Sequence, residues 1–188
     1  MRQLVFFLLF IQSTFAGVLF EPHATLHASG DATLLNESYG MSAIDGGLGI
    51  GYQNNLPFFK AEMTGHFRTL ESPGGTKENF IGVAYVVGAG IRFSDVLRLY
   101  AGWMPSVEMK STADESTYSG SGFKGELSFL IYRPWMMHFF SEFKNETFDT
   151  QTTKNGVITK LEGDLSFEVS SIAIGVSFPF DFWGRQVR

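Results

Sequence analysis

The sequence predicts an all-β protein, an antiparallel up-and-down β-barrel of eight strands, and three observations lead to this prediction. Apolar and polar residues alternate with a period of two along eight segments, which is the spacing of strands that have one apolar face. The connections between these segments are alternately short and long. The chain has 188 residues, enough for one domain of ordinary size with a sizeable core.

The composition excludes several classes of protein. A hydrophobic fraction of 44% is too high for a disordered chain. The absence of cysteine excludes a disulfide scaffold, a thiol nucleophile, a zinc–thiolate site and a cysteine-anchored lipoprotein. The formal net charge of −5 argues against nucleic acid as the main partner.

The alternating segments cover most of the chain. They span residues 17–29, 41–53, 56–70, 79–93, 97–110, 119–132, 136–148 and, near the end, 172–180. In the segment 97–110 the pattern places Val107 on the apolar face and Glu108 on the polar face. Before the last segment the alternation slips at Ser170 and Ser171, which we interpret as a β-bulge.

The lengths of the connections predict how the strands are joined. Short turns are expected at 54–55, 94–96 and 133–135, and longer polar loops at 30–40, 71–78, 111–118 and 149–164. Three short turns on one side and four longer loops on the other join eight strands, so both ends of the barrel chain lie on the short-turn side.

The first sixteen residues predict a secretory signal peptide. Arg2 precedes an unbroken apolar run over 4–11, and the small residues Thr14 and Ala16 occupy the −3 and −1 positions of a cleavage site. An apolar run of eight residues is too short for a membrane-spanning helix, which needs about 20 residues. We therefore expect residues 1–16 to be removed and residues 17–188 to form a single domain.

The alternation alone does not decide whether the apolar faces form a soluble core or meet lipid. Glycines on the polar faces favour a narrow, closed lumen, where small residues make room for larger neighbours. They are Gly47, Gly49, Gly51, Gly82, Gly88, Gly90 and Gly102. Aromatic residues near the short-turn end favour a lipid–water boundary at that level. They are Phe20, Tyr52, Phe58, Phe93, Trp135, Phe180, Phe182 and Trp183.

The end of the chain carries a recognisable pattern. Gly175, Phe178 and Phe180 follow the order glycine, two spacers, aromatic, one spacer, aromatic. This resembles the C-terminal assembly signal of bacterial outer-membrane proteins. Together with the leader and the eight segments, it makes the chain similar to the small eight-stranded outer-membrane barrels of the OmpA/OmpX type over residues 17–188.

The resemblance implies a transmembrane barrel in a Gram-negative outer membrane, with short periplasmic turns and longer outer loops. The implied partners are outer-membrane lipid, lipopolysaccharide and the outer-membrane assembly machinery. Three departures from the family pattern stand out. The chain continues past the last aromatic residue of the pattern, Ala173 stands where a polar or bulky residue is usual, and Pro179 interrupts the closing strand.

Charged residues on the inward faces predict a network inside the barrel. Near the middle of three strands, opposite charges are almost balanced. These residues are Lys60, Glu62, Lys124, Glu126, Glu142 and Lys144. Because an unpaired buried charge costs several kcal/mol, we expect them to pair across neighbouring strands, with Glu142 and Lys144 facing Lys124 and Glu126, and to block the lumen. A gated ion path or proton relay is the alternative.

The four histidines share the inward parity but predict no metal site. They are His23, His27, His66 and His138. His23 and His27 are four residues apart, about 13 Å along a strand, which is too far for them to share one ion. We expect these imidazoles to form hydrogen bonds within the charge network instead.

Nucleophilic catalysis needs a serine, a histidine and an acid within reach of one another. In the closest candidate, His138 and Ser141 are separated by an offset of three and therefore lie on opposite faces of a strand. The His-x-Ser spacing of lipid A deacylases occurs once, at His27 and Ser29. We expect no catalytic residues and no cofactor.

These observations predict a monomeric, non-catalytic, porin-like integral outer-membrane protein. Its role is structural, or it binds a ligand of unspecified chemistry through its outer loops. Two alternatives stay open. One is a lipid A-modifying acyltransferase or deacylase of the same fold, and the other is a soluble lipocalin-like barrel with its apolar faces turned inward around a ligand.

Overall fold

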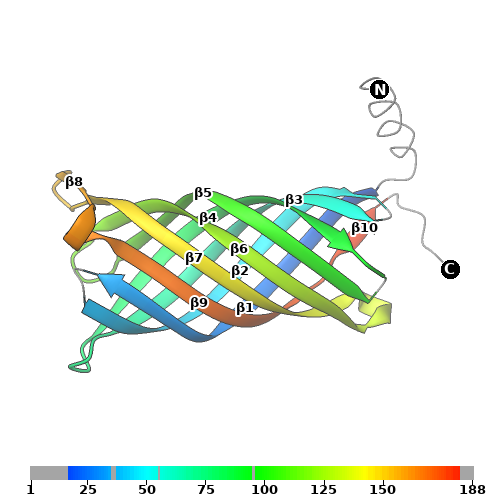
Figure 1. Cartoon of the computed structure of the whole chain (residues 1–188), viewed down its shortest axis with the longest axis horizontal. Coiled ribbons are helices and arrows are strands. Elements are labelled where there is room, and N and C mark those ends of the chain that lie inside the picture. Colours follow the sequence, from blue (N-terminus) through cyan, green and yellow to red (C-terminus); the bar gives the residue numbers. More distant parts are fainter. Residues whose placement is uncertain (1–16, 35–36, 55, 95, 183–188) are drawn as a thin grey trace, which may run out of the picture.

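A computed structural model describes residues 17–34, 37–54, 56–94 and 96–182. The predicted signal peptide, residues 1–16, lies outside this part of the chain. Eight long antiparallel strands close into a barrel (Figure 1), which confirms the predicted fold class. No helix in the described ranges has the length and apolar character needed to span a membrane.

Seven strands of the ring are continuous and the eighth is interrupted. The seven are β1 (Gly17–Leu34), β2 (Glu37–Gln53), β3 (Pro57–Glu71), β4 (Lys77–Arg92), β5 (Leu97–Ser111), β6 (Thr117–Tyr132) and β7 (Met137–Thr152). The eighth consists of β9 (Phe167–Ser177) and β10 (Phe180–Phe182), separated by Phe178 and Pro179. Because β9 pairs with both β7 and β1, the ring closes, and β10 continues the pairing with β1.

The two ends of the barrel are named here after the strands that mark them in Figure 1. The β10 end holds the start of β1, the short turns and a 3-10 helix, η2 (Arg133–Trp135). The β8 end holds the other connections, among them β8 (Ile158–Lys160), which pairs with β7, and a second 3-10 helix, η3 (Gly163–Leu165).

The strands are longer at the β8 end than the sequence predicts. β1 and β2 stay paired as far as Leu34 and Glu37, and β3 and β4 as far as Glu71 and Lys77. The predicted loop 30–40 is therefore wrong, because most of its residues belong to β1 and β2. The predicted loops 71–78 and 111–118 are present but shorter, since residues 72–76 and 112–116 connect the strands. Only the connection after β7 is long.

In the half of the barrel next to the β10 end, the outward side chains are apolar. Exposed residues on this surface, which we call the apolar wall, include Leu26, Ile44, Leu48, Ile50, Phe59, Met63, Val87, Leu99, Phe123, Phe143 and Ile174. Of the predicted aromatic belt, five residues are exposed: Tyr52, Phe93, Trp135, Phe180 and Phe182. The prediction is wrong for Phe58, because its side chain points into the lumen and stacks on Tyr100. Trp183 lies outside the described residues.

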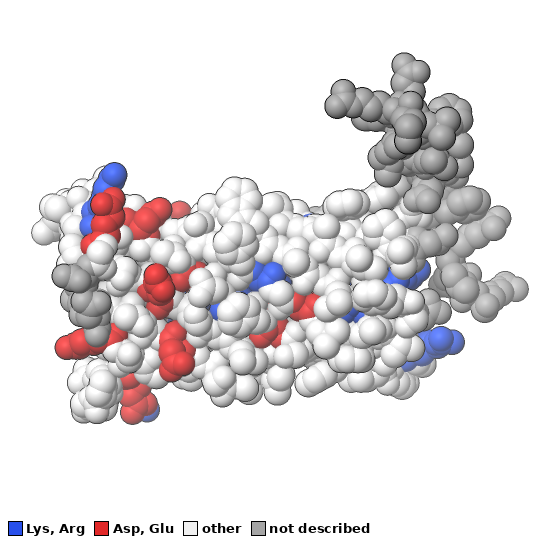
Figure 2. All heavy atoms as spheres, in the orientation of Figure 1, with Lys and Arg blue, Asp and Glu red and all other residues white. Residues whose placement is uncertain are grey.

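In the half next to the β8 end, the polarity is reversed. Apolar side chains fill the lumen and form one buried cluster, which we call the apolar lumen layer. It consists of Ala32, Met41, Ala43, Leu70, Phe80, Ala84, Val86, Met104, Val107, Met109, Tyr118, Phe148, Leu161, Phe167 and Val169. The outward residues of the long strands are mostly polar here, although Ile158 of β8 is exposed, and Figure 2 shows acidic side chains gathered at this end.

This reversal corrects the predicted bulge in the last strand. β9 keeps its register with β7 throughout, and Phe167 and Val169 point inward in phase with Ala173. The apolar residues change face because their surroundings change, so the pattern slips while the backbone does not. The irregularity lies in β1 instead, between His27 and Ser29.

A second irregularity changes the faces of β5. The register of β5 with β6 shifts between Met104 and Val107. As a result Val107 is buried in the apolar lumen layer and Glu108 is exposed outside. The predicted faces of both residues are therefore wrong, because a shift of one position exchanges inside and outside.

The lumen glycines make room for their neighbours, as expected. A Cβ on Gly82 would lie 2.1 Å from Nε2 of His66, and one on Gly88 would lie 2.3 Å from the carbonyl oxygen of Ala101. The outward glycine Gly125 has no such neighbour within 4 Å. The narrow interior therefore requires glycine where the outer surface does not.

Candidate functional site in the lumen

The six charged residues singled out from the sequence all point into the lumen. Lys60 and Glu62 come from β3, Lys124 and Glu126 from β6, and Glu142 and Lys144 from β7. Strand alternation places them there, because their neighbours along the strand, which are apolar or small except for Asn145 after Lys144, point outward. All six are buried.

Lys124 is the centre of this group. Its Nζ lies 2.7 Å from Glu142, 2.8 Å from Glu62 and 3.5 Å from Glu126. The contact with Glu62 crosses the lumen from β6 to β3. Lys60 contacts Glu62 at 2.6 Å and Glu126 at 3.8 Å, so the two lysines share the same two carboxylates.

The cross-strand arrangement differs from the prediction. β6 and β7 are in a register that places Lys124 opposite Lys144 and Glu126 opposite Glu142. The expectation that opposite signs face each other directly is therefore wrong. The attractive contacts of Lys124 run diagonally and across the lumen, since side chains in a narrow barrel reach strands that are not neighbours.

Five further charged residues extend the network, and the sequence reasoning did not include them. They are Glu21, Asp45, Arg68, Arg98 and Glu146. Arg98 donates two hydrogen bonds to Glu21, of 3.1 and 3.2 Å. Arg68 donates two to Glu146, one of them 2.7 Å long. Their positions in the alternating pattern could have indicated this, because all five alternate with outward residues and therefore point into the lumen.

The complete network is nearly balanced in charge. The buried carboxylates are Glu21, Asp45, Glu62, Glu126, Glu142 and Glu146, and the buried cations are Lys60, Arg68, Arg98, Lys124 and Lys144. Six acids against five bases leave a net charge of −1 with neutral imidazoles. We call these eleven residues the charged lumen layer.

Aromatic rings cap this layer toward the β10 end. Leu19, Phe58 and Tyr100 form a small buried cluster. The Arg98 guanidinium lies 4.4 Å from the centre of the Phe58 ring, and Lys60 Nζ lies 4.4 Å from that of Tyr100. These cation–π contacts join the charged layer to the rings below it.

The histidines are distributed along the lumen. His27 Nε2 lies 2.9 Å from Asp45, and His23 Nε2 lies 3.3 Å from the hydroxyl of Thr64. His23 and His27 thus have separate partners.

One group has the residue types of a metal site. His27, Asp45 and Glu142 place ligand atoms within 4.8 Å of one another. Lys144 Nζ, however, lies 2.5 Å from Asp45 and 2.8 Å from Glu142, so an ammonium group already supplies the positive charge there. A metal ion would have to displace Lys144, and the arrangement fits an ion-pair cluster better.

The candidate pair His138 and Ser141 forms no catalytic arrangement. In β1 a register shift separates buried His27 from exposed Ser29. Ser141 faces outward, whereas His138 is buried in the lumen. The register places His138 opposite Ser177 of β9, which in turn lies opposite His23 of β1. Ser177 and His138 are each only 1% exposed, so neither side chain is open to a substrate from outside the barrel.

The residues of the predicted assembly signal lie around the break in the eighth strand. Gly175 is paired with Thr25 and Phe140, and a Cβ there would lie 2.4 Å from the carbonyl oxygen of Ala24. The backbone N–H of Phe178 donates to Pro22 at 3.0 Å, and Phe180 is exposed on β10.

Hydrogen bonds fix the turn between β5 and β6 at the β8 end. The backbone N–H and the hydroxyl of Ser116 donate to the Asp114 carboxylate at 2.9 and 2.8 Å. These bonds, led by the backbone one, lower the pKa of Asp114. In the neighbouring apolar lumen layer, burial raises the pKa of Tyr118 to about 12.

A closed eight-stranded barrel with an apolar wall around a charged interior has the architecture of bacterial outer-membrane barrels. The sequence matches no protein-family model and no curated protein. Among solved structures, the chain is similar to Neisserial surface protein A (NspA), with 14% identity and a TM-score of 0.50 over 88% of this chain and 99% of that one. At this identity the likeness shows the fold alone.

Two further structures are less similar. OprG from Pseudomonas aeruginosa has 10% identity and a TM-score of 0.36 over 88% of this chain and 96% of its own. The outer membrane protease OmpT from Escherichia coli has 9% identity and a TM-score of 0.32 over 88% of this chain and 95% of its own. Neither likeness is strong enough to carry an argument about function.

Proposed function

We propose that the chain is a non-catalytic, monomeric integral protein of the bacterial outer membrane, with a closed lumen and a structural or surface-binding role. The observation that carries the proposal is the arrangement of charge in the half next to the β10 end. There the buried residues are charged and the exposed residues are apolar. Water outside would strongly disfavour such a surface, whereas hydrocarbon outside favours it.

The same observation speaks against a soluble lipocalin-like barrel. That alternative expects the apolar faces inside, yet Leu26, Ile44 and Phe143 point outward around a charged lumen. The partners in our proposal are outer-membrane lipid and lipopolysaccharide around the wall, and the assembly machinery, which would recognise Gly175, Phe178 and Phe180.

We assign the surface-binding role to the β8 end as a whole, and not to long loops alone. The connections β3–β4 and β5–β6 have only five residues each, so the longer connection after β7 and the polar outer faces of the strands offer most of the surface. Exposed acidic residues are frequent there, among them Glu71, Glu108, Asp149 and Glu168.

Fractionation and heat-modified gel migration test the location. The folded protein should sediment with outer membranes and migrate differently before and after boiling. Recovery of most of the protein in the soluble periplasmic fraction would overturn the proposal.

Conductance across a planar lipid bilayer tests the closed lumen. Neither the wild type nor Glu126→Ala should give a stable ohmic conductance, because the charged and the apolar lumen layers close the barrel in series. A large ohmic conductance from the wild type would contradict this and indicate a channel.

The absence of catalysis has its own test. The mass spectrum of lipid A should be the same in strains that lack and strains that overproduce the protein. An altered acyl pattern would show lipid A-modifying activity.

A further inference from the structure

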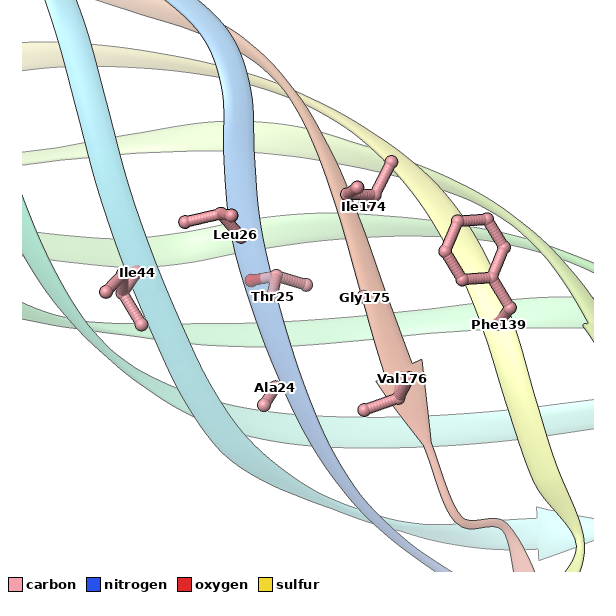
Figure 3. Close-up of a pocket in the computed structure, with 8 residues that line it drawn as sticks. All are labelled: Ala24, Thr25, Leu26, Ile44, Phe139, Ile174, Gly175 and Val176. Atoms are coloured by element: carbon pink, nitrogen blue, oxygen red, sulfur yellow. The ribbon is translucent and has the colours of Figure 1, made fainter.

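A shallow hollow on the apolar wall offers no reactive group (Figure 3). It has a volume of about 380 Å³ and lies where β1, β2, β7 and β9 meet. Its outward side chains are aliphatic or aromatic, and Thr25, its one polar lining residue, is buried on the inward face of β1. Under the proposed function lipid hydrocarbon covers this surface. Reactive groups lie instead at the β8 end, in the turn that joins β7 to β8.

The turn between β7 and β8 carries an exposed asparagine that is followed by glycine (Figure 1). Asn155 is the only asparagine in the sequence with glycine after it. Both Asn155 and Gly156 are exposed, and with the described residues the Asn155 side chain forms no hydrogen bond. Its amide group is therefore accessible to water and free to rotate against the backbone.

The backbone of the turn leaves the nitrogen of Gly156 open to its surroundings. Gly156 has a φ of 79°, and a Cβ on it would meet nothing within 4 Å. Its N–H donates to the carbonyl oxygen of Thr153 at 2.9 Å, and the N–H of Thr153 donates to Val157 at 2.9 Å. One hydrogen bond thus holds the Gly156 nitrogen, and no side chain on its own residue shields it.

The Asn155 amide and the Gly156 nitrogen are the reactants of intramolecular deamidation. Once the hydrogen bond to Thr153 opens, the deprotonated nitrogen of Gly156 attacks Cγ of Asn155. A bond between this nitrogen and Cγ forms, the Cγ–Nδ2 bond breaks, and the side-chain nitrogen leaves as ammonia, which gives a five-membered succinimide ring. Water then opens the ring at either carbonyl and yields aspartate or isoaspartate. Water is the only co-reactant.

We propose that Asn155 is a site of spontaneous deamidation that changes the β8 end irreversibly. Either product adds a negative charge next to Lys154, whose Nζ lies 2.8 Å from Glu115. Isoaspartate also adds one carbon atom to the backbone of the turn, so the two hydrogen bonds across it lose their geometry. Because β8 pairs with β7 through only three residues, Ile158–Lys160, this product releases β8. The proposal goes beyond the proposed function and does not depend on the membrane location.

Two asparagines within strands serve as internal controls. Asn145 is half-buried, its Nδ2 donates to Ser170 at 2.8 Å, and glutamate follows it. The side-chain oxygen of Asn79 accepts from Thr69 at 2.8 Å, and phenylalanine follows it. In both cases the side chain is held, and the next residue has a Cβ that crowds the attacking nitrogen.

The turn between β3 and β4 supplies a matched control, because it has the same hydrogen bonds. The N–H of Ser72 donates to Thr76 at 2.9 Å, and that of Gly75 donates to Ser72 at 2.8 Å. Gly75 has a φ of 79°, as Gly156 does. Position 74 corresponds to position 155 and is glycine. Gly74→Asn therefore places a second asparagine–glycine pair in the same backbone geometry.

Peptide mapping by mass spectrometry tests the site on the full chain, folded in detergent. The protein is incubated at neutral and at mildly alkaline pH, and loss of the side-chain amide is followed at each asparagine. We expect Asn155 to react at least five-fold faster than Asn79 and Asn145, and faster at alkaline pH because the attacking nitrogen must lose its proton. In Gly74→Asn, position 74 should react at a similar rate. In Asn155→Gln, position 155 should stay intact, because a glutamine would have to form a less favourable six-membered ring.

Amide hydrogen exchange tests the structural consequence. Exchange over residues 157–161 should accelerate in the incubated wild type and stay unchanged in incubated Asn155→Gln. An intact Asn155 after a period in which the urea-unfolded wild type is deamidated would overturn the site, because the folded turn would then protect it. Equal rates at the three asparagines would overturn the role of the turn. Unchanged exchange in samples that contain isoaspartate would overturn the release of β8.

Discussion

The two halves of the barrel are built from the same strands but place apolar residues on opposite faces. Next to the β10 end, the wall is apolar and the lumen contains the charged layer. Next to the β8 end, the outer face is polar and the lumen contains the apolar layer. β7 shows both arrangements, since Phe143 is exposed on the wall and Phe148 is fully buried inside.

The opposite polarity of the two halves indicates where the medium around the barrel changes. Apolar side chains gather away from water, so they turn outward where the outside is hydrocarbon and inward where it is water. Under our proposal the half next to the β8 end stands above the bilayer and is stabilised as a water-soluble barrel is. The half next to the β10 end crosses the membrane and keeps its polar groups satisfied inside.

Breaking the charged lumen layer should destabilise the barrel more than any other single change considered. Lys124→Met leaves Glu62, Glu126 and Glu142 without their shared cation, and should lower the free energy of unfolding by about 3–5 kcal/mol. Lys77→Met is the matched control, since it breaks an exposed pair with Glu71 that is worth about 0–1 kcal/mol. Urea unfolding in lipid vesicles measures both, and equal losses would show that the buried network adds nothing.

Truncation on the two faces of β7 should separate the halves of the barrel. Phe148 stacks on Phe167 in the apolar lumen layer with ring centres 4.8 Å apart, and Phe148→Ala should cost about 3–5 kcal/mol. Phe143→Ala on the wall exchanges one apolar contact with lipid for another and should cost much less. Unfolding measurements that rank the two variants in the reverse order would contradict the reversal of polarity.

A scan of outward charges should locate the boundary between the halves. Ile174→Arg, like Val87→Arg, places a cation on the apolar wall and should cost about 2–4 kcal/mol. Thr147→Arg lies on the polar outer face and should cost about 0–1 kcal/mol. Assembly yield and unfolding free energy report the effect, and a uniform cost along the strands would refute a membrane boundary between these positions.

Replacing glycine by alanine should have the smallest effects on stability, and it compares a lumen-facing position with an outward one. Gly88→Ala forces a Cβ against the backbone of β5 and should cost about 1–3 kcal/mol. Gly125→Ala meets nothing within 4 Å, so it should be neutral or stabilise the barrel by up to about 1 kcal/mol. Thermal unfolding of the two variants measures the difference in stability. Equal stabilities would show that the lumen around Gly88 is loosely packed.

Much of the fold could be predicted from the local pattern, because odd and even positions of a strand point to opposite faces. The alternation around Lys60, Lys124 and Glu142 placed these side chains inside without any knowledge of the neighbouring strands. Parity also held the signal for Glu21 and Arg98, which the sequence reasoning passed over. The faces of Val107 and Glu108 were out of reach, because a register shift is a property of two paired strands.

Local spacing along the chain was enough to predict the number of strands, the end of the barrel at which the first strand starts and the last strand finishes, and which residues share a face in each regular stretch. These follow from local spacing, since the period of two is intrinsic to an extended backbone. The pairing of the charges, in contrast, is a result of the tertiary structure. Lys124 meets Glu62 across the lumen, and Lys144 stands opposite it, because the stagger of the closed ring fixes the relative height of the strands. It also decided that the pattern around Phe167 and Val169 changes face without a bulge, since their burial depends on the seven other strands around them.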